Sequence, residues 1–358
     1  MKKTLFLFLA LAAVFSAVAA CVNAPVGQNN QVANAKRADG KIRIGFSMDT
    51  LKEEHWQRDK DLIEKRAAEL GAEIYTSVAD GNDERQVKQI DDFLTKGIDV
   101  LIIAPHNDQV AASAVAKAKA QGVSVISYDR LVKSDSLDLY LSHQHSKAGQ
   151  MQAEYALQHQ PKGNYVMVYG ASTDNNAQIM KAAQLAVLKP AVERGDIKIV
   201  AEQFAAEWSS ENALKIVENA LTQNKNEVVA VITSNDGTAG GAIQALKAQS
   251  LTGKTVVTGM DAQLDALQRI AQGEQTMTVY KPIQPLAYAA VEAAIKLAKG
   301  EPLNTTDKIK AVDKEIPSIF IEPKIIDKSN LMDVVKDGYH KFEDIYANVP
   351  ADQRPKNQ

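Results

Sequence analysis

Cysteine is almost absent from this chain of 358 residues, which contains only Cys21. A single cysteine excludes an internal disulfide and any zinc or iron–sulfur site built from several thiolates. Aromatic residues are also few, at 6% of the chain, and only Trp56 and Trp208 are tryptophans. The net charge of -3 indicates no extended basic surface, so we expect no nucleic-acid partner.

Long apolar runs are absent after the first twenty residues, so we expect no transmembrane helix. The start combines two lysines with an apolar segment at 5–18, which is typical of a secretory signal peptide over residues 1–20. It ends in Val18-Ala19-Ala20-Cys21, which resembles the lipobox of bacterial lipoproteins. Soluble export with an incidental cysteine is the alternative. We expect lipidated Cys21, a flexible tether over residues 21–40, and a periplasmic or cell-surface location on the membrane.

From residue 41 onward, short apolar segments alternate with amphipathic ones. Strand patterns fall at 42–46, 72–76, 98–103, 123–127 and 137–141, and again at 164–170, 197–200, 228–233 and 255–258. Helical patterns fall at 59–70, 84–96, 109–121, 210–223, 238–249, 262–272 and 286–299. Such alternation predicts parallel sheets covered by helices. Because the series starts twice, we expect two similar α/β lobes, a short hinge near Ser142-His143 and a cleft between the lobes.

Polar side chains follow several of the predicted strands. Asp129-Arg130 follows the strand at 123–127, Asn235 follows that at 228–233, and Asp261 follows that at 255–258. Ligands of open α/β sheets bind beyond the carboxyl ends of the strands, so these positions are candidates for a polyol site. Taken alone, the Asp129-Arg130 pair favours a surface ion pair that closes a turn. We interpret Asp236 as the N-cap of the following helix rather than as a ligand group.

The two tryptophans occupy comparable places in the two series of strands. Trp56 falls at the first strand-to-helix turn, and Trp208 precedes the helix at 210–223. A flat apolar ring beside polar groups is typical of a carbohydrate platform. The alternative, two rings that fill gaps in the core, is less favoured because both lie in polar sequence.

Seven runs within residues 41–345 resemble the periplasmic sugar-binding proteins of the ribose, galactose and xylose group, most of all its xylose-binding branch. They are 128–130, 173–177, 211–216, 234–236, 240–246, 275–283 and 334–341. The resemblance implies two Rossmann-like lobes of the type I periplasmic binding protein fold. The lobes would comprise residues 41–142 plus 282–317 and residues 143–281 plus 318–345, with a tail at 346–358. The three hinge segments would lie near Ser142-His143, Lys281-Pro282 and 316–318.

The same resemblance implies a function and a set of binding residues. It implies a monomeric substrate-binding protein of an ABC importer, with an aldopentose, D-xylose, as ligand, a membrane permease as partner and no cofactor. The sugar ring would lie between Trp56 and Trp208, and its hydroxyls would be held by Asp129, Arg130, Asn176, Asn235, Asp261 and Lys281. His55 stands where the family has an arginine, so one hydroxyl contact and the sugar preference depend on it.

Other function classes remain as alternatives to a transport protein. A sugar-processing enzyme could use Asp129 and Asp261 as acid and base, but holding hydroxyls without chemistry needs the same carboxylates. No nucleophile elbow or phosphate loop is present, so we expect no enzyme. A sugar sensor or a protein that presents its ligand to a chemoreceptor is a further alternative. His143 and His145 lack a third metal ligand nearby in sequence, so we expect a surface pair and no metal site.

Overall fold

A computed structural model describes residues 40–305 and 307–356, and the described residues from Lys41 onward form one compact unit. The predicted signal peptide, Cys21 and nearly all of the predicted tether lie outside the described residues. None of the helices in the described ranges is long and apolar enough to cross a membrane.

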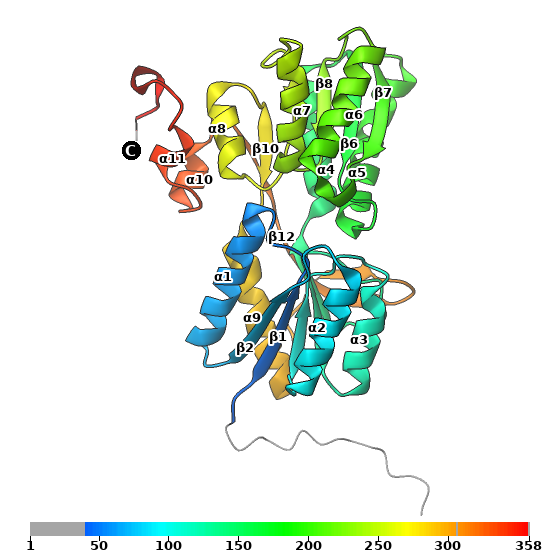
Figure 1. Ribbon diagram of the computed structural model, residues 1–358, viewed down its shortest axis with the longest axis vertical. Coiled ribbons are helices and arrows are strands. Elements are labelled where there is room, and N and C mark those ends of the chain that lie inside the picture. Colours follow the sequence, from blue (N-terminus) through cyan, green and yellow to red (C-terminus); the bar gives the residue numbers. More distant parts are fainter. Residues whose placement is uncertain (1–39, 306, 357–358) are drawn as a thin grey trace, which may run out of the picture. The chain divides into compact units, whose positions relative to one another are not determined.

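The first lobe is built on a seven-stranded sheet with the order β11-β12-β5-β4-β3-β1-β2 (Figure 1). All neighbouring strands pair in parallel except β11 and β12. Helices α1 and α9 pack on one face, and α2 and α3 on the other. The strands are β1 (Arg43–Met48), β2 (Glu73–Val78), β3 (Val100–Ile103), β4 (Ser124–Tyr128), β5 (Leu139–His143), β11 (Asp307–Lys310) and β12 (Glu315–Ile321). The helices are α1 (Glu54–Glu69), α2 (Asp83–Thr95), α3 (Ala111–Ala120) and α9 (Ile283–Lys299).

The second lobe is built on a four-stranded parallel sheet with the order β7-β6-β8-β9. Helices α6 and α7 cover one face, and α4 and α5 the other. The strands are β6 (Gly163–Tyr169), β7 (Ile197–Phe204), β8 (Ala230–Thr233) and β9 (Val256–Val257). The helices are α4 (His145–His159), α5 (Asn175–Glu193), α6 (Ser210–Gln223) and α7 (Asp236–Ala248), with a short 3-10 turn η1 (Ala206–Trp208) before α6.

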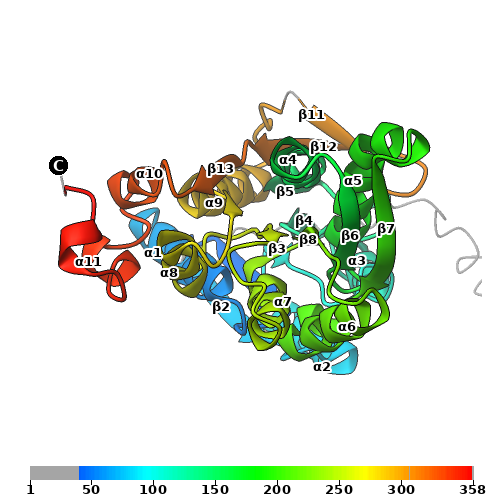
Figure 2. The ribbon, with the colours of Figure 1, turned by 90° about the horizontal axis from the view of Figure 1, so that it is seen from above.

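A smaller group of elements flanks the four-stranded sheet on the side away from β7 (Figure 2). Strand β10 (Met277–Tyr280) pairs antiparallel with β13 (Lys324–Asp327), and α8 (Leu264–Gln272) shares a hydrophobic cluster with α10 (Met332–Lys336) and α11 (Phe342–Ile345). The chain continues to a last short turn, η2 (Ala351–Gln353). A bridge between Met260 and Val279 joins this group to the end of β9.

The predicted α/β fold with two lobes and parallel sheets is confirmed. Buried strands such as β3 are continuously apolar, as strands covered on both faces must be. Several helices begin at side-chain caps, including Asn82 before α2 and Ser209 before α6. Helix α1 starts five residues earlier than its predicted start at 59, which places Trp56 in the first helical turn rather than in a loop.

The chain passes between the two lobes after β5, after β10 and after β12. The third passage was predicted at 316–318, and this position is wrong, since residues Ser318–Ile321 pair with Tyr140–His143 and remain in the seven-stranded sheet. Pro317 is tolerated in β12 because pairing with β5 begins only at Ser318. The lobe boundaries given from the sequence otherwise stay a prediction.

Candidate ligand-binding site

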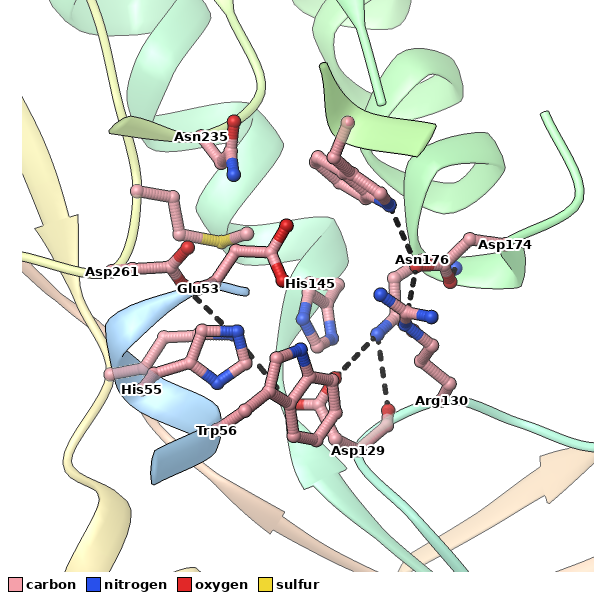
Figure 3. A pocket seen from close by; sticks show the side chains of 13 residues that line it. Glu53, His55, Trp56, Asp129, Arg130, His145, Asp174, Asn176, Asn235 and Asp261 are labelled. Carbon is pink, nitrogen blue, oxygen red and sulfur yellow. Dashed lines mark hydrogen bonds and ion pairs between the residues drawn. The ribbon is translucent and has the colours of Figure 1, made fainter. Parts of the chain in front are cut away.

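A pocket lies between the two lobes, beyond the carboxyl ends of strands from both sheets (Figure 3). It holds about 310 Å³ of space, part of which is open to solvent. All nine residues predicted to bind a ligand line it: His55, Trp56, Asp129, Arg130, Asn176, Trp208, Asn235, Asp261 and Lys281. The structure thus brings together residues from seven different connections, of which six lead from a strand to a helix and one leads from β4 to β5. Their contact with a ligand stays a prediction.

Trp56 forms part of the first-lobe wall. Its side chain is 1% exposed, and its Nε1 has no hydrogen-bond partner among the described residues. The guanidinium carbon of Arg130 lies 5.3 Å from the ring centroid, and the His55 ring lies 4.4 Å away. The Trp56 indole therefore presents an apolar face to the pocket beside Arg130 and His55. Its Nε1 is a donor that a ligand could use.

Asp129 is held at the end of β4 in a left-handed conformation, with φ of 58°. Asp is among the few residues that tolerate this region. Its carbonyl accepts hydrogen bonds from Tyr140 Oη at 2.8 Å and Ser142 Oγ at 2.6 Å, which fix the turn. Its carboxylate Oδ1 accepts a bond from Asn176 Nδ2 of the second lobe at 3.0 Å. The turn thus aims the carboxylate across the cleft.

Arg130 is 7% exposed and forms no surface pair with Asp129, so the surface-pair interpretation is wrong. Its Nη1 donates to Asp49 Oδ2 at 2.6 Å, and its Nε lies 2.8 Å from Asp174 Oδ2. Trp208 Nε1 donates to the same Asp174 oxygen at 3.2 Å. The guanidinium therefore links the two lobes through partners that are remote in sequence.

Trp208 reaches the pocket through a strained turn. Glu207 and Trp208 both have positive φ, at 56° and 53°. A Cβ atom on Gly170 would come within 2.3 Å of the indole, so a glycine is required where the ring passes the end of β6. Trp208 also packs in a small cluster with Ala171 and Ala177, and Trp56 belongs to the first-lobe core. Both rings therefore contribute to the core as well as to the pocket.

Lys281 lies between two carboxylates at the centre of the site. Its Nζ is 3.0 Å from Asp261 Oδ1 and 3.6 Å from Asp129 Oδ2. Burial is the largest influence and by itself would raise both carboxyl pKa values, but Lys281 and the neighbouring histidines together outweigh it. The pKa of Asp129 is therefore well below its usual range, and that of Asp261 is lowered. Both groups are therefore ionised acceptors, and neither is the proton donor that a sugar-cleaving acid–base pair requires.

Asn235, not Asp236, caps helix α7, so the sequence-based interpretation of Asp236 is wrong. Asn235 Oδ1 accepts bonds from Thr238 N at 2.9 Å and Thr238 Oγ1 at 2.7 Å. Asp236 is fully buried and accepts bonds from Gln275 Nε2 and Thr278 Oγ1. Burial, followed by the charge of Asp261, raises the pKa of Asp236 to about 8. Adjacent Asn and Asp both suit an N-cap, and only the fold fixes which one occupies it.

The expected surface pair of histidines is also wrong, because His143 and His145 are both buried. His143 Nε2 lies 3.0 Å from the carbonyl oxygen of Pro282. His145 lines the pocket, where burial lowers its pKa to about 3 and keeps it neutral. The described part of the chain holds no group of three potential metal ligands.

Sequence reasoning missed four lining residues, namely Glu53, His145, Asp174 and Met260. Asp174 lay within a run that resembles the sugar-binding family, and its Oδ1 caps α5 by accepting from Asn176 N at 2.8 Å. Met260 directly precedes the predicted Asp261. No pattern in the sequence distinguishes Glu53 from its neighbour Glu54.

Two α/β lobes that enclose a buried polar pocket with two indole rings define a two-lobed ligand-binding protein. The family described as a periplasmic binding protein domain matches residues 44–302. The chain is 44% identical over 317 residues to the D-xylose-binding periplasmic protein of Escherichia coli K12, covering 88% of this chain and 95% of that protein. It therefore belongs to the periplasmic binding protein family, whose members bind solutes, and it is not an enzyme.

More distant relatives and solved structures agree with this assignment. A multiple sugar-binding periplasmic receptor of Rhizobium radiobacter is 29% identical over 345 residues, covering 90% of this chain and 97% of the receptor. A solute-binding protein of Chloroflexus aurantiacus in complex with D-glucose superposes with a TM-score of 0.80 at 27% identity, covering 85% of this chain and 98% of the other. A solute-binding protein of Clostridium phytofermentans with bound β-D-glucose superposes with a TM-score of 0.79 at 28% identity, covering 85% of this chain and 99% of the other.

Proposed function

We propose that this chain binds a monosaccharide in the interlobe pocket, with D-xylose as its ligand, and delivers it to an ABC importer. The observation that carries the proposal is the convergence of nine predicted side chains, two of them tryptophans, on one buried pocket. The two related proteins that are 44% identical to this chain are both D-xylose-binding periplasmic proteins.

The chemistry of the lining suits a neutral polyol. Arg130, Lys281 and the Trp56 indole offer donors, while the ionised Asp129 and Asp261 offer acceptors. Two indoles supply apolar faces for the C–H surface of a pyranose ring. An epimer that leaves one of these buried groups unpaired loses about 1–3 kcal/mol, which provides selectivity.

His55 bears on the sugar preference because it replaces the family arginine. Its Nδ1 lies 3.1 Å from Asp59 Oδ2, a carboxylate that also accepts a bond from Tyr128 Oη. Burial is the largest influence and opposes the imidazolium, but the charge of Asp261 and the charge and hydrogen bond of Asp59 together outweigh it and raise the pKa of His55. The proposal assigns His55 one hydroxyl of the sugar, contacted through the ring edge opposite Nδ1.

The proposal includes export, a lipid on Cys21 and a permease in the membrane as partner of the monomeric chain. Export is supported by the periplasmic relatives. Mass spectrometry of the mature protein tests the anchor, since lipidation requires a diacylated N-terminal cysteine and soluble export does not.

Calorimetric titration of residues 41–358 with a panel of aldoses tests the binding function. We expect D-xylose to bind with a dissociation constant of about 1 μM or lower, which corresponds to a binding free energy of about -8 kcal/mol. The proposal fails if no pentose or hexose binds more tightly than about 1 mM.

A further inference from the structure

Glu53 occupies the N-cap position of α1 without capping the helix. Ser, Thr, Asp and Asn are preferred at this position because their side chains accept a hydrogen bond from the first helical turn. The Glu53 side chain makes no such bond and is directed into the pocket (Figure 3). Only 9% of the residue is exposed, and its Oε2 has no hydrogen-bond partner among the residues that the structure describes. A buried carboxylate oxygen without a donor is destabilising, so this arrangement suits a ligand donor.

Glu53 also lies on the boundary between the pocket and a second chamber. Glu53, Arg130 and Trp208 line both spaces. The chamber continues past the carboxyl ends of β1, β2 and β3, and holds about 540 Å³ of space, part of which is open to solvent. There is thus room beyond Glu53 for a group that projects from a bound ring.

Two neighbouring carboxylates of the chamber, Asp49 and Asp80, differ from Glu53 because each is paired with a basic side chain. Asp49 Oδ2 accepts from Arg130, and its Oδ1 lies 2.9 Å from His106 Nδ1. Asp80 Oδ2 accepts from Arg85 Nη1 at 2.6 Å. Glu207, the remaining carboxylate of the chamber, is exposed to solvent, so among the described residues Glu53 is the buried carboxylate of this wall that lies in no ion pair.

We propose that Glu53 accepts a hydrogen bond from an exocyclic hydroxymethyl group, and that the site consequently takes aldohexopyranoses of the gluco configuration as well as D-xylose. This inference rests on the proposed sugar-binding function. D-Glucose differs from D-xylose only by a hydroxymethyl group at C5, so the two pyranoses can present the same ring hydroxyls to the central residues. Glu53 then meets the one group that is added.

Three ligands distinguish the room for an added carbon from the hydrogen bond of its hydroxyl. They are D-xylose, D-glucose and 6-deoxy-D-glucose, which keeps the added carbon but lacks its hydroxyl. Each is titrated calorimetrically into the wild type, Glu53→Leu and Glu53→Gln. We expect Glu53→Leu to weaken D-glucose binding by about tenfold or more and the other two sugars by less than about threefold. Glu53→Gln, which keeps an acceptor oxygen, should give a smaller loss for D-glucose. Asp80→Asn is the matched control, because it removes a carboxylate from the same chamber that is exposed and already paired.

The possible outcomes are distinct. If the Glu53 variants still bind D-xylose, they are folded. A loss of D-glucose binding alone then supports the inference. An equal loss for all three sugars would mean that Glu53 meets a ring hydroxyl, and no loss for any would mean that it meets none; either result overturns the inference. Binding of D-xylose without D-glucose by the wild type also overturns it. Failure of the wild type to bind any aldose would instead refute the proposed function.

Discussion

Three charged side chains, Asp129, Asp261 and Lys281, balance one another in the centre of the pocket. Each is buried, and a buried charge without its partner is strongly unfavourable. In the folded protein the pKa values of Asp129 and Asp261 lie below the value of about 3.9 that an unfolded Asp has. These groups therefore contribute stability that is complete above that pH and is lost as the pH falls through the folded-state values.

Substitution of Asp129 tests this balance. We expect Asp129→Ala to abolish measurable sugar binding, because it removes a central acceptor and one of the two carboxylates that lie beside the Lys281 ammonium. Asp129→Asn keeps the shape and tolerates the left-handed backbone, so we expect it to weaken binding by roughly 10- to 100-fold. Calorimetry measures the affinity, and circular dichroism reports whether the fold is intact. Wild-type affinity of the Asn variant, compared with the exposed control Asp61→Asn, would contradict the prediction.

At the scale of elements, the site depends on strained turns after the strands. Asp129 follows β4, Trp208 follows β7 and Asp261 follows β9, and all three have positive φ. Each turn is held by its surroundings, as when Tyr339 Oη donates to the Asp261 carbonyl at 3.2 Å. Such strain persists only where the rest of the structure compensates for it. The turns are therefore positioned by the two sheets and not by their own sequence.

Gly170→Ala tests how rigidly the turn of Trp208 is positioned. An added Cβ would overlap the indole, so we expect a displaced ring, a fold destabilised by about 1–3 kcal/mol and sugar affinity reduced by about tenfold or more. Urea unfolding, tryptophan fluorescence and calorimetry measure the three effects. Gly240→Ala is the control, since its Cβ would meet only the flexible Arg269 side chain at 3.4 Å. Unchanged affinity in Gly170→Ala would show that the Trp208 ring does not need this position.

The whole molecule is closed around the pocket by contacts that lie outside it. Glu54 Oε2 of the first lobe accepts a bond from Leu264 N at 3.0 Å, and the Arg58 guanidinium lies 4.3 Å from the Tyr339 ring centroid. On another side, Lys52 Nζ donates to the Glu207 carbonyl at 3.2 Å. These contacts form only when the lobes meet, so they favour the closed state and add indirectly to ligand affinity.

Glu54→Gln tests the coupling between closure and binding. The variant weakens an interlobe contact without changing a residue that lines the pocket, so we expect sugar affinity to fall about three- to tenfold through a smaller closed population. Small-angle scattering should show a larger radius of gyration for the variant at subsaturating sugar. Glu64→Gln is the control, because Glu64 pairs with Lys60 inside the same helix. Equal effects of the two substitutions would show that closure does not depend on this contact.

The sequence by itself determined the succession of strands and helices, because apolar periodicity reflects burial in each element. It also placed Asp129, Asn235 and Asp261 at strand ends, and parallel strands bring such ends to one edge of a sheet. Trp56 and Trp208 were found because tryptophan is rare in the chain. Arg130 came with Asp129 from the same strand end, whereas Asn176, Lys281 and His55 came from the resemblance to a family and not from local pattern.

Only the tertiary structure decided which groups meet. Arg130 pairs with Asp49 and Asp174, which are far from it in sequence, rather than with the adjacent Asp129. The burial of His143 and His145 likewise depends on how the second lobe closes over the first, as does the lack of a hydrogen-bond partner for Glu53 Oε2 among the described residues. The local sequence pattern shows which positions of one helix or strand are buried. The ion pairs and the direction of a side chain depend instead on residues that come close only when the chain folds.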